Sequence, residues 1–552
     1  MSLSLFDIVG PFMMGPSSSH TAGAARIGYM ARLILGREPE RVTLYFHPVL
    51  MQTYAGHRTH AALVAGLLGY REGDPAGIYA LEIAMAKGIA VNVEQIDSPH
   101  VHQNTMRIKA ETGATVVVIN GISVGGGSIL ISEIDGVPVA LDGNTYALLL
   151  RAPAPADETI KAILAPYKVV GFSEGRVGPN HLACWALRQE VPAKVLAAVQ
   201  AEVPSASLHL IPPLYRFRQV SDEPVLFCTF SELLDLTQQG MSLPQVALSY
   251  EERRSEKSEE SVRDGMCEIL SVMRAAVEEG LSGQVKLLGG FCPGDDGWRL
   301  MQAAQQGKTI TSGIFTAALA RALAVVELNG AMGRVVAAPT AGSAGVLPGV
   351  LFSVGEYLKK SEADLIDALL VADVVGICIA NKASLSGAVG GCQGEVGVAA
   401  AMAASAATFL GGGDAEACIH AAALTLKNIL GLICDPAAGP VEVPCIKRNA
   451  MGAAIALMGA ELALAGIRSY IPPDEVVDAL VNVQKLLPQE LKGSTVGGLG
   501  CTRTAERMRS EWQQKLSPTS ALRALEPLRH LCSLSNYVTI LRPYLNRFNH
   551  SQ

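Results

Sequence analysis

The chain has 552 residues, too many for one ordinary hydrophobic core, so roughly two to four domains are expected. Aromatic residues are only 5% of it, the formal net charge is −7, and no cluster of lysine and arginine argues for nucleic acid or an anionic membrane as a partner. Eleven scattered cysteines and no N-terminal signal-peptide pattern predict a cytoplasmic protein without a disulfide framework.

Three long segments with few or no charges raise the question of a membrane span, because the mean hydropathy of the chain is +0.29. Proline or aspartate interrupts two of them, residues 335–355 and 365–380, and the third, residues 396–413, is mostly alanine and glycine. None supplies about 20 consecutive strongly apolar residues. We therefore expect buried segments of a soluble protein.

Residues 1–144 alternate short apolar strands with helical stretches, which predicts an α+β N-terminal domain. Residues 145–222 have the pattern of a compact βαββαβ unit. The expected strands are residues 42–46, 114–119, 129–134, 137–141, 146–150, 168–172, 182–187 and 207–211. The expected helices are residues 22–33, 59–68, 157–164 and 193–199.

From residue 223 to 510 the pattern is helical almost throughout, and the many small residues favour close helix packing. The charged stretch 251–263 is interpreted as a solvated linker or helix surface. Residues 511–552 carry several arginines and are expected to include a terminal apolar helix. The predicted fold is thus an α+β domain, a small βαββαβ domain and a mostly all-α domain.

Three cysteines lie in unusual settings, each within a few residues of glycine or proline and close to charged residues: Cys392, Cys434 and Cys445. Three thiolates can hold an iron–sulfur cube and leave one iron open, whereas four close the cluster for electron transfer. An open iron acts as a Lewis acid. The alternative is that these are small buried hydrophobic residues, as expected for Cys184, Cys228, Cys378 and Cys418. The sequence has no Cys-x-x-Cys pair, so neither a zinc ribbon nor a ferredoxin is indicated.

Two histidine-bearing segments precede predicted helices. Gly15–Thr21 reads Gly-Pro-Ser-Ser-Ser-His-Thr, and its hydroxyls and backbone amides suit a carboxylate or a phosphate, although an ordinary N-cap would also explain them. His20 in this segment is a candidate acid or base. His57 lies in the second segment, Gly56–His60. The stretch from His100 to Arg107 contains a His-x-His pair, which is either a metal site or, more commonly, polar loop residues.

Two further loops are rich in small or hydroxyl residues. The loop at residues 338–345 carries Thr340 and Ser343 and could bind a small zwitterion, or could simply connect two helices. The segment 381–387 contains Lys382, a candidate Schiff-base lysine. No glycine-rich phosphate cradle for pyridoxal phosphate accompanies this lysine, so a solvated surface lysine is the better interpretation.

Taken together, five segments resemble the iron–sulfur-dependent bacterial L-serine dehydratases, in the family's order and over about residues 4–510: Gly15–Thr21, Pro339–Gly345, Gly391–Gly397, Leu430–Pro436 and Val441–Asn449. The chain looks like a single-chain fusion of the β and α subunits that some bacteria make separately. The resemblance implies a β-type domain at 1–144, related to an allosteric substrate-binding domain, and an ACT-like domain at 145–222. It also implies a catalytic domain at 223–510, followed by an extension at 511–552.

The resemblance further implies that Cys392, Cys434 and Cys445 bind a 4Fe-4S cluster, that no pyridoxal phosphate is used, and that His20 and His57 act near catalysis. The expected reaction is the conversion of L-serine to pyruvate and ammonia, in amino-acid degradation, by a cytoplasmic homodimer. Candidate residues for holding the substrate are Ser17, Ser18, Ser19, Thr21, Asn104, Thr340, Ser343, Lys447 and Arg448. The family usually has Gly and Asp where Arg58 and His60 stand here. Alternatives are the same chemistry on L-threonine or L-cysteine, or a non-enzymatic sensor of an amino acid and oxygen.

Overall fold

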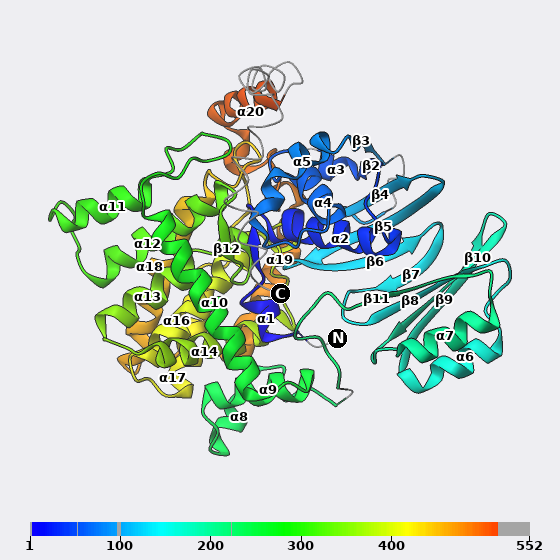
Figure 1. The fold of residues 1–552 in the computed structure, drawn as a ribbon. Helices are drawn as coiled ribbons and strands as arrows, with labels where there is room; N and C mark the ends of the chain where they lie inside the picture. The colour runs from blue at the N-terminus through cyan, green and yellow to red at the C-terminus, as the bar shows by residue number, and fades with distance from the viewer. Residues whose placement is uncertain (1–2, 52, 97–100, 222, 517–552) are drawn as a thin grey trace, which may run out of the picture.

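The computed structural model describes residues 3–51, 53–96, 101–221 and 223–516 (Figure 1). A sheet-rich half formed by the N-terminal part of the chain lies beside a helical half formed by the rest, as Figure 1 shows in blue and cyan against green to orange. The predicted change from mixed α/β structure to helical structure is confirmed. None of the described helices is long and apolar enough to cross a membrane.

The larger sheet has six strands in the order β3-β2-β4-β5-β6-β7, and only the β2–β3 pair is parallel. Its strands are β2 (Arg41–Phe46), β3 (Ala90–Gln95), β4 (Thr105–Thr112), β5 (Thr115–Gly125), β6 (Ser128–Ile134) and β7 (Val137–Leu141). The sequence did not lead us to expect β3 or β4. The outward positions of β4 are charged (Arg107, Lys109, Glu111), and β3 is a largely exposed edge strand, so neither is a clear apolar run.

Two helices of the sheet-rich half cross at very short range. Helix α2 (Gly23–Leu35) packs on β5, and α4 (Thr59–Leu67) packs on α2. A Cβ atom on Gly28 would lie 2.1 Å from the Leu63 carbonyl oxygen, and one on Gly66 would lie 2.1 Å from that of Ala25. Only glycine allows this approach, and it brings together the two segments that precede the helices. The shorter helices of this region are α3 (Pro48–Met51), η2 (Pro75–Tyr79) and α5 (Ala80–Ala86).

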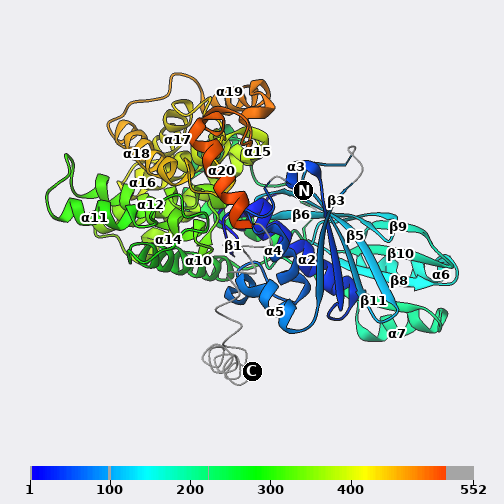
Figure 2. The ribbon, with the colours of Figure 1, turned by 90° about the horizontal axis from the view of Figure 1, so that it is seen from above.

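The smaller sheet contains the expected βαββαβ elements, with strands in the antiparallel order β11-β8-β10-β9. They are β8 (Tyr146–Ala152), α6 (Glu158–Leu164), η3 (Ala165–Tyr167), β9 (Val169–Val177), β10 (Asn180–Leu187), α7 (Ala193–Glu202) and β11 (Ser207–Ile211). Leu148, Leu150 and Trp185 belong to the core shared with α6 and α7, whereas Leu149 and Cys184 join the core of the larger sheet. The unit lies at the end of the molecule farthest from the helical half (Figure 2).

The helical half is built around α16, which is buried along almost its whole length. Small residues allow this packing: a Cβ atom on Gly345 would lie 2.1 Å from the Ala322 carbonyl oxygen of α12. The helices are α8 (Phe230–Gln238), α9 (Leu243–Ser255), α10 (Glu259–Gly280), α11 (Asp296–Gln305), α12 (Ile314–Gly330), η4 (Ala341–Ser343), α13 (Val346–Tyr357), α14 (Glu362–Ala380), α15 (Gly387–Gly390), η5 (Gln393–Gly397), α16 (Val398–Leu410), α17 (Ala415–Lys427), α18 (Cys445–Leu464), α19 (Pro473–Leu486), η6 (Gln489–Leu491), η7 (Gly498–Cys501) and α20 (Arg503–Leu516). Most of the apolar helix expected within residues 511–552 lies outside the described residues.

The first residues of the chain belong structurally to the helical half. Helix α1 (Leu5–Ile8) contributes Leu5 and Ile8 to the helical core, and β1 (Phe12–Met14) pairs with β12 (Arg334–Val336). Glu251 and Arg254 are only 0% and 5% exposed, so the prediction that residues 251–263 are solvated is wrong for these two residues. The Glu251 carboxylate accepts hydrogen bonds from the Ser4 hydroxyl and the Leu5 N–H, both at 2.9 Å, and pairs with Arg254 at 2.6 Å.

Candidate functional site

The three cysteines singled out in the sequence converge at two helix starts and in one loop of the helical half. Cys392 directly precedes η5, a π-helical turn that runs into α16, Cys434 lies in the loop after α17, and Cys445 is the first residue of α18. The sulfurs of Cys392 and Cys434 lie within 4.8 Å of each other and of a carboxylate oxygen of Glu395. A hydrogen bond with Cys392, together with burial, raises the pKa of Cys434. Burial, then the neighbouring Cys392 and Glu395, raise that of Cys445.

Arg448 ties two of the cysteine segments to α18. Its guanidinium donates to Cys392 Sγ at 3.5 Å, to the Ile433 carbonyl oxygen at 2.8 Å and to Asp435 Oδ1 at 2.7 Å. Asp435 is only 2% exposed, and its second oxygen accepts the Leu499 N–H at 2.8 Å. The guanidinium and the carboxylate therefore hold the Cys434 loop against Cys392.

Two further polar side chains fix the segment around Cys445. Asn449 donates to the carbonyl oxygens of Gly342 (2.8 Å) and Cys445 (3.0 Å), which joins the loop at 338–345 to the start of α18. The buried carboxylate of Glu442 accepts four backbone N–H groups, at 2.6–3.3 Å, from consecutive residues 289–292. These bonds make the turn before Cys445 part of the rigid framework.

Glu395 is a site residue that the sequence reasoning noted only as a charge near the cysteines. The Thr340 hydroxyl donates to its Oε1 at 2.9 Å, and burial raises the pKa of the carboxyl to about 7. A Cβ atom on Gly387 would lie 2.3 Å from Glu395 Oε2 and 3.2 Å from Cys434 Sγ, so glycine is needed where these two groups meet. The signal in the sequence was the spacing Cys392-x-x-Glu395 between glycines at a helix start.

His20 and His57 form a stacked pair in the sheet-rich half, with ring centroids 4.8 Å apart. His20 lies in η1 (Ser18–Ala22), a π-helical turn before α2, and its Nε2 is 3.3 Å from Asn104 Oδ1. The Asn104 amide nitrogen donates to the Ser123 carbonyl oxygen, so Oδ1 faces His20 as an acceptor and Nε2 carries the proton. Among the described residues, Nδ1 of His57 has no hydrogen-bond partner.

Lowering the pH from 7 to about 4 is expected to destabilise the fold through this pair. Burial lowers the pKa of His57 to about 3 and also lowers that of His20 from 6.5. Between about pH 3 and pH 6.5, His57 binds a proton in the unfolded chain but not in the folded chain. Stability that is present above pH 6.5 is therefore lost as the pH falls. Urea unfolding at a series of pH values measures this loss. His57→Gln should reduce the slope by at most about 1.4 kcal/mol per pH unit, and an unchanged slope would contradict the assignment.

The histidine pair and the cysteine group approach each other through three loop contacts. Asn329 Nδ2 donates to the carbonyl oxygens of Pro16 (3.2 Å) and Ala341 (3.0 Å), and so joins the serine-rich loop to the loop at 338–345. A Cβ atom on Gly56, next to His57, would lie 3.2 Å from the backbone of Gly439. A Cβ atom on Gly125 would lie 4.0 Å from Ser386, which precedes the Cys392 segment. The two halves thus bring their chemically distinctive loops to one boundary.

The serine-rich loop is held by its own hydroxyls. Ser17 Oγ accepts the His20 N–H at 3.1 Å, and the Thr21 hydroxyl donates to the His57 carbonyl oxygen at 2.8 Å. Ser18 is buried, and Ser19 is partly exposed. These contacts fix the position of the loop, and the substrate roles of its residues stay predictions.

The other residues proposed to hold a substrate also have partners within the protein. Ser343 is fully buried and donates to the Ala338 carbonyl oxygen at 3.1 Å. Lys447 pairs with Asp296 and donates to Cys292 Sγ at 3.7 Å, away from the bonds that join the cysteine group.

Lys382 pairs with Asp478, as expected of a surface lysine. His100 lies outside the described residues.

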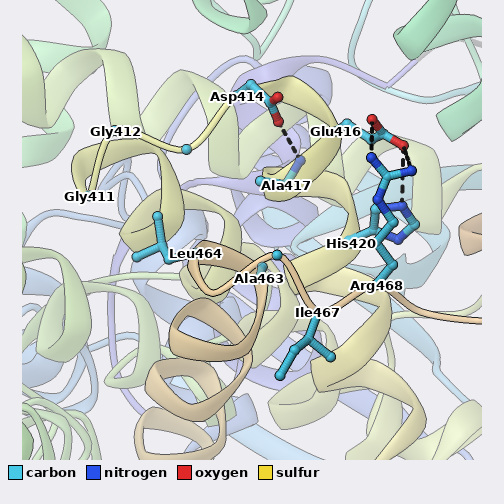
Figure 3. A pocket seen from close by; sticks show the side chains of 12 residues that line it. Gly411, Gly412, Asp414, Glu416, Ala417, His420, Ala463, Leu464, Ile467 and Arg468 are labelled. Atoms are coloured by element: carbon cyan, nitrogen blue, oxygen red, sulfur yellow. Dashed lines mark hydrogen bonds and ion pairs between the residues drawn. The ribbon is translucent and has the colours of Figure 1, made fainter.

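A separate pocket of about 410 Å³ lies in the helical half, between the loop Gly411–Asp414 and residues 463–468 (Figure 3). Its charged groups already pair, since Glu416 contacts both Arg468 at 2.8 Å and His420 at 3.7 Å. None of the three converging cysteines lines it. The candidate site is therefore the cysteine group rather than this pocket.

The donor set of the cysteine group suits an iron–sulfur cluster. Three thiols converge with one carboxylate in glycine-rich turns, and thiolates are the ligands that iron–sulfur clusters use. The cationic Arg448 beside Cys392 Sγ would stabilise bound sulfur. Among the described residues, no fourth cysteine joins the group.

Comparisons with known proteins identify the family of the chain. A family model described as serine dehydratase alpha chain matches residues 238–500. The L-serine dehydratase of Streptomyces coelicolor is 32% identical over 518 residues, which cover 90% of this chain and 98% of that protein. The chain belongs to the L-serine dehydratase family.

Two further relatives of this family are an alpha chain and a beta chain of one organism. A probable L-serine dehydratase alpha chain of Bacillus subtilis is 44% identical over 284 residues, covering 51% of this chain and 94% of that protein. A probable L-serine dehydratase beta chain of the same organism is 46% identical over 147 residues, covering 27% of this chain and 67% of that protein. One chain here therefore combines what Bacillus subtilis has as two, as the resemblance implied.

Proposed function

We propose that this chain is an iron–sulfur-dependent L-serine dehydratase that converts L-serine to pyruvate and ammonia. The observation that carries the proposal is the convergence of three thiols, two at helix starts and one in a loop, beside a boundary that also holds a stacked histidine pair. Cys392, Cys434 and Cys445 would hold a 4Fe-4S cluster with one iron that no cysteine binds. When bound, that iron supplies a Lewis acid for a departing hydroxyl group.

The chain's own residues would handle the proton on Cα of serine. His20 and His57 are the candidate bases, because burial lowers both pKa values and leaves both rings neutral at pH 7. Asn104 orients His20 through Nε2, whereas Nδ1 of His57 is free among the described residues. Loss of the proton and of the hydroxyl gives aminoacrylate, which tautomerises and hydrolyses to pyruvate and ammonia.

The domain division is part of the same proposal. We propose a β-type domain at 1–144, an ACT-like domain at 145–222, a catalytic domain at 223–510 and an extension at 511–552, in a cytoplasmic homodimer. The strand order β11-β8-β10-β9, joined by α6 and α7 in a βαββαβ succession, supports the ACT-like assignment. The backbone amides and hydroxyls of residues 17–21 are the proposed contacts for the substrate carboxylate.

Anaerobic reconstitution with iron, sulfide and a reductant, followed by a pyruvate assay with L-serine, tests the proposal. The expected protein is brown, and its activity is lost in air and restored by reconstitution. Parallel assays with L-threonine and L-cysteine, which measure the corresponding keto acid or pyruvate, define the substrate. A cluster-loaded protein that binds serine without forming pyruvate would instead indicate a sensor.

A further inference from the structure

The cysteine group includes a carboxylate that the proposed cluster ligands leave unexplained. One oxygen of Glu395 lies within 4.8 Å of the sulfurs of both Cys392 and Cys434. A partly buried carboxylate beside the buried thiol of Cys392 and the partly buried thiol of Cys434 is unfavourable unless it binds a cation or a hydrogen-bond donor. Its hydrogen-bond donors are the Thr340 hydroxyl, at 2.9 Å from Oε1, and the Gly387 backbone N–H, so it has no cationic partner at hydrogen-bond distance among the described residues.

The second oxygen, Oε2, faces the cysteine side of the site. It lies next to Gly387, at the point where Cys434 Sγ also approaches. Glu395 is fixed in place by η5, the turn that also carries Cys392 at its start. The carboxylate and the two sulfurs therefore come from a rigid framework and share one small space.

The remaining described cysteines are engaged elsewhere and do not supply a fourth thiolate. Cys184, Cys378 and Cys418 are buried in hydrophobic cores. Cys292 accepts from Lys447, and Cys501 donates to the Val496 carbonyl oxygen. A carboxylate oxygen is also an iron ligand, and it binds less tightly than a thiolate to a soft metal site.

We propose that Glu395 ligates, through Oε2, the cluster iron that no cysteine holds, and that it leaves this iron when substrate binds. The inference rests on the proposed function, since it needs the cluster. The exchange replaces the carboxylate oxygen of Glu395 by the hydroxyl oxygen of the substrate, so no electrons are transferred. The Thr340 hydroxyl keeps Glu395 in place after it leaves. The glutamate thus protects the labile iron between turnovers.

The test compares wild type with Glu395→Gln, both as the full chain reconstituted anaerobically. Iron and sulfide per chain are measured first, and ferricyanide is then added while the EPR signal of the three-iron form is followed. The variant, whose amide is a poor iron ligand, should lose the labile iron roughly tenfold faster. With ⁵⁷Fe placed at that position, Mössbauer parameters should differ between the two proteins without L-serine and become alike with it.

Two control variants and one variant of intermediate effect make the result specific. Glu416→Gln, in the separate pocket, should behave as wild type, and so should Cys532→Ser, which changes the one cysteine of the sequence that lies outside the described residues. Thr340→Val, which frees Oε1 but keeps the carboxylate, should give an intermediate rate of iron loss. If Glu395→Gln takes up no iron, the test uses Glu395→Asp instead. Its shorter carboxylate should reach the iron less well, so the labile iron should be lost faster than from wild type.

The outcomes separate the inference from the function it depends on. Wild-type protein that takes up no cluster overturns the proposed function. A wild-type cluster whose iron loss and Mössbauer parameters are unchanged by either substitution of Glu395 overturns only the inference. If Cys532→Ser, rather than the Glu395 variants, lost the labile iron faster than wild type, that iron would be assigned to Cys532. This result would also overturn the inference.

Discussion

Cys434→Ser is expected to abolish pyruvate formation and to leave the chain folded with less than a full complement of iron. A serine hydroxyl is a much poorer ligand than a thiolate for iron–sulfur clusters. The loop itself should persist, because the backbone of residue 434 bonds to the Leu491 carbonyl oxygen and the Gly493 N–H, both at 2.8 Å. A Lewis acid that contributes several kcal/mol corresponds to a loss of roughly 10³-fold or more in kcat.

Iron and sulfide analysis, the visible absorption of the cluster and the anaerobic pyruvate assay measure this effect together. Cys267→Ser is the matched control, because Cys267 is exposed and its thiol contacts only Glu362 among the described residues, at 3.8 Å. The control should retain both iron and activity. A Cys434→Ser protein with full activity and full iron content would refute the cluster assignment.

The sequence made the cysteines recognisable because each lies in a local setting that packing alone does not require. Glycine and proline turns with charged neighbours surround Cys392, Cys434 and Cys445, and each turn can be recognised from a few consecutive residues. For Glu395 the local signal, its spacing from Cys392 between glycines, was not enough to give it a role. Its significance depends on Thr340, 55 residues earlier, and on the missing side chain of Gly387, which meet only in the folded chain.

The fold shows the same limit. The strand β7 was predictable because its apolar alternation is a local pattern, and β10 because it contains a short continuous apolar run. The position of the N-terminal segment was not, because the Glu251 carboxylate that binds it lies 246 residues from its partner Leu5. A charged run such as 251–263 favours a solvated surface on local grounds, and only the long-range partners turn two of its charges into buried anchors.

Arg448→Met is the second change for which a large effect is expected. It leaves Asp435 buried without its cation, which typically costs about 3–5 kcal/mol of stability. It also removes the bonds from α18 to Cys392 Sγ and to the Ile433 carbonyl oxygen, so the Cys434 loop loses its attachment to the other cysteines. Iron content should therefore fall together with the free energy of unfolding. Urea unfolding followed by circular dichroism measures the second quantity.

A double variant separates the two roles of Arg448. Adding Asp435→Asn to Arg448→Met removes the unpaired buried charge, so part of the lost stability should return. Iron content should not return, because neither substitution restores the bridge between Cys392 and the loop of Cys434. Arg448→Lys should give an intermediate result, since an ammonium group cannot span three acceptors as the planar guanidinium does. If iron content instead followed stability in all three variants, Arg448 would act only by supporting the fold, and its link to the cysteines would carry no separate function.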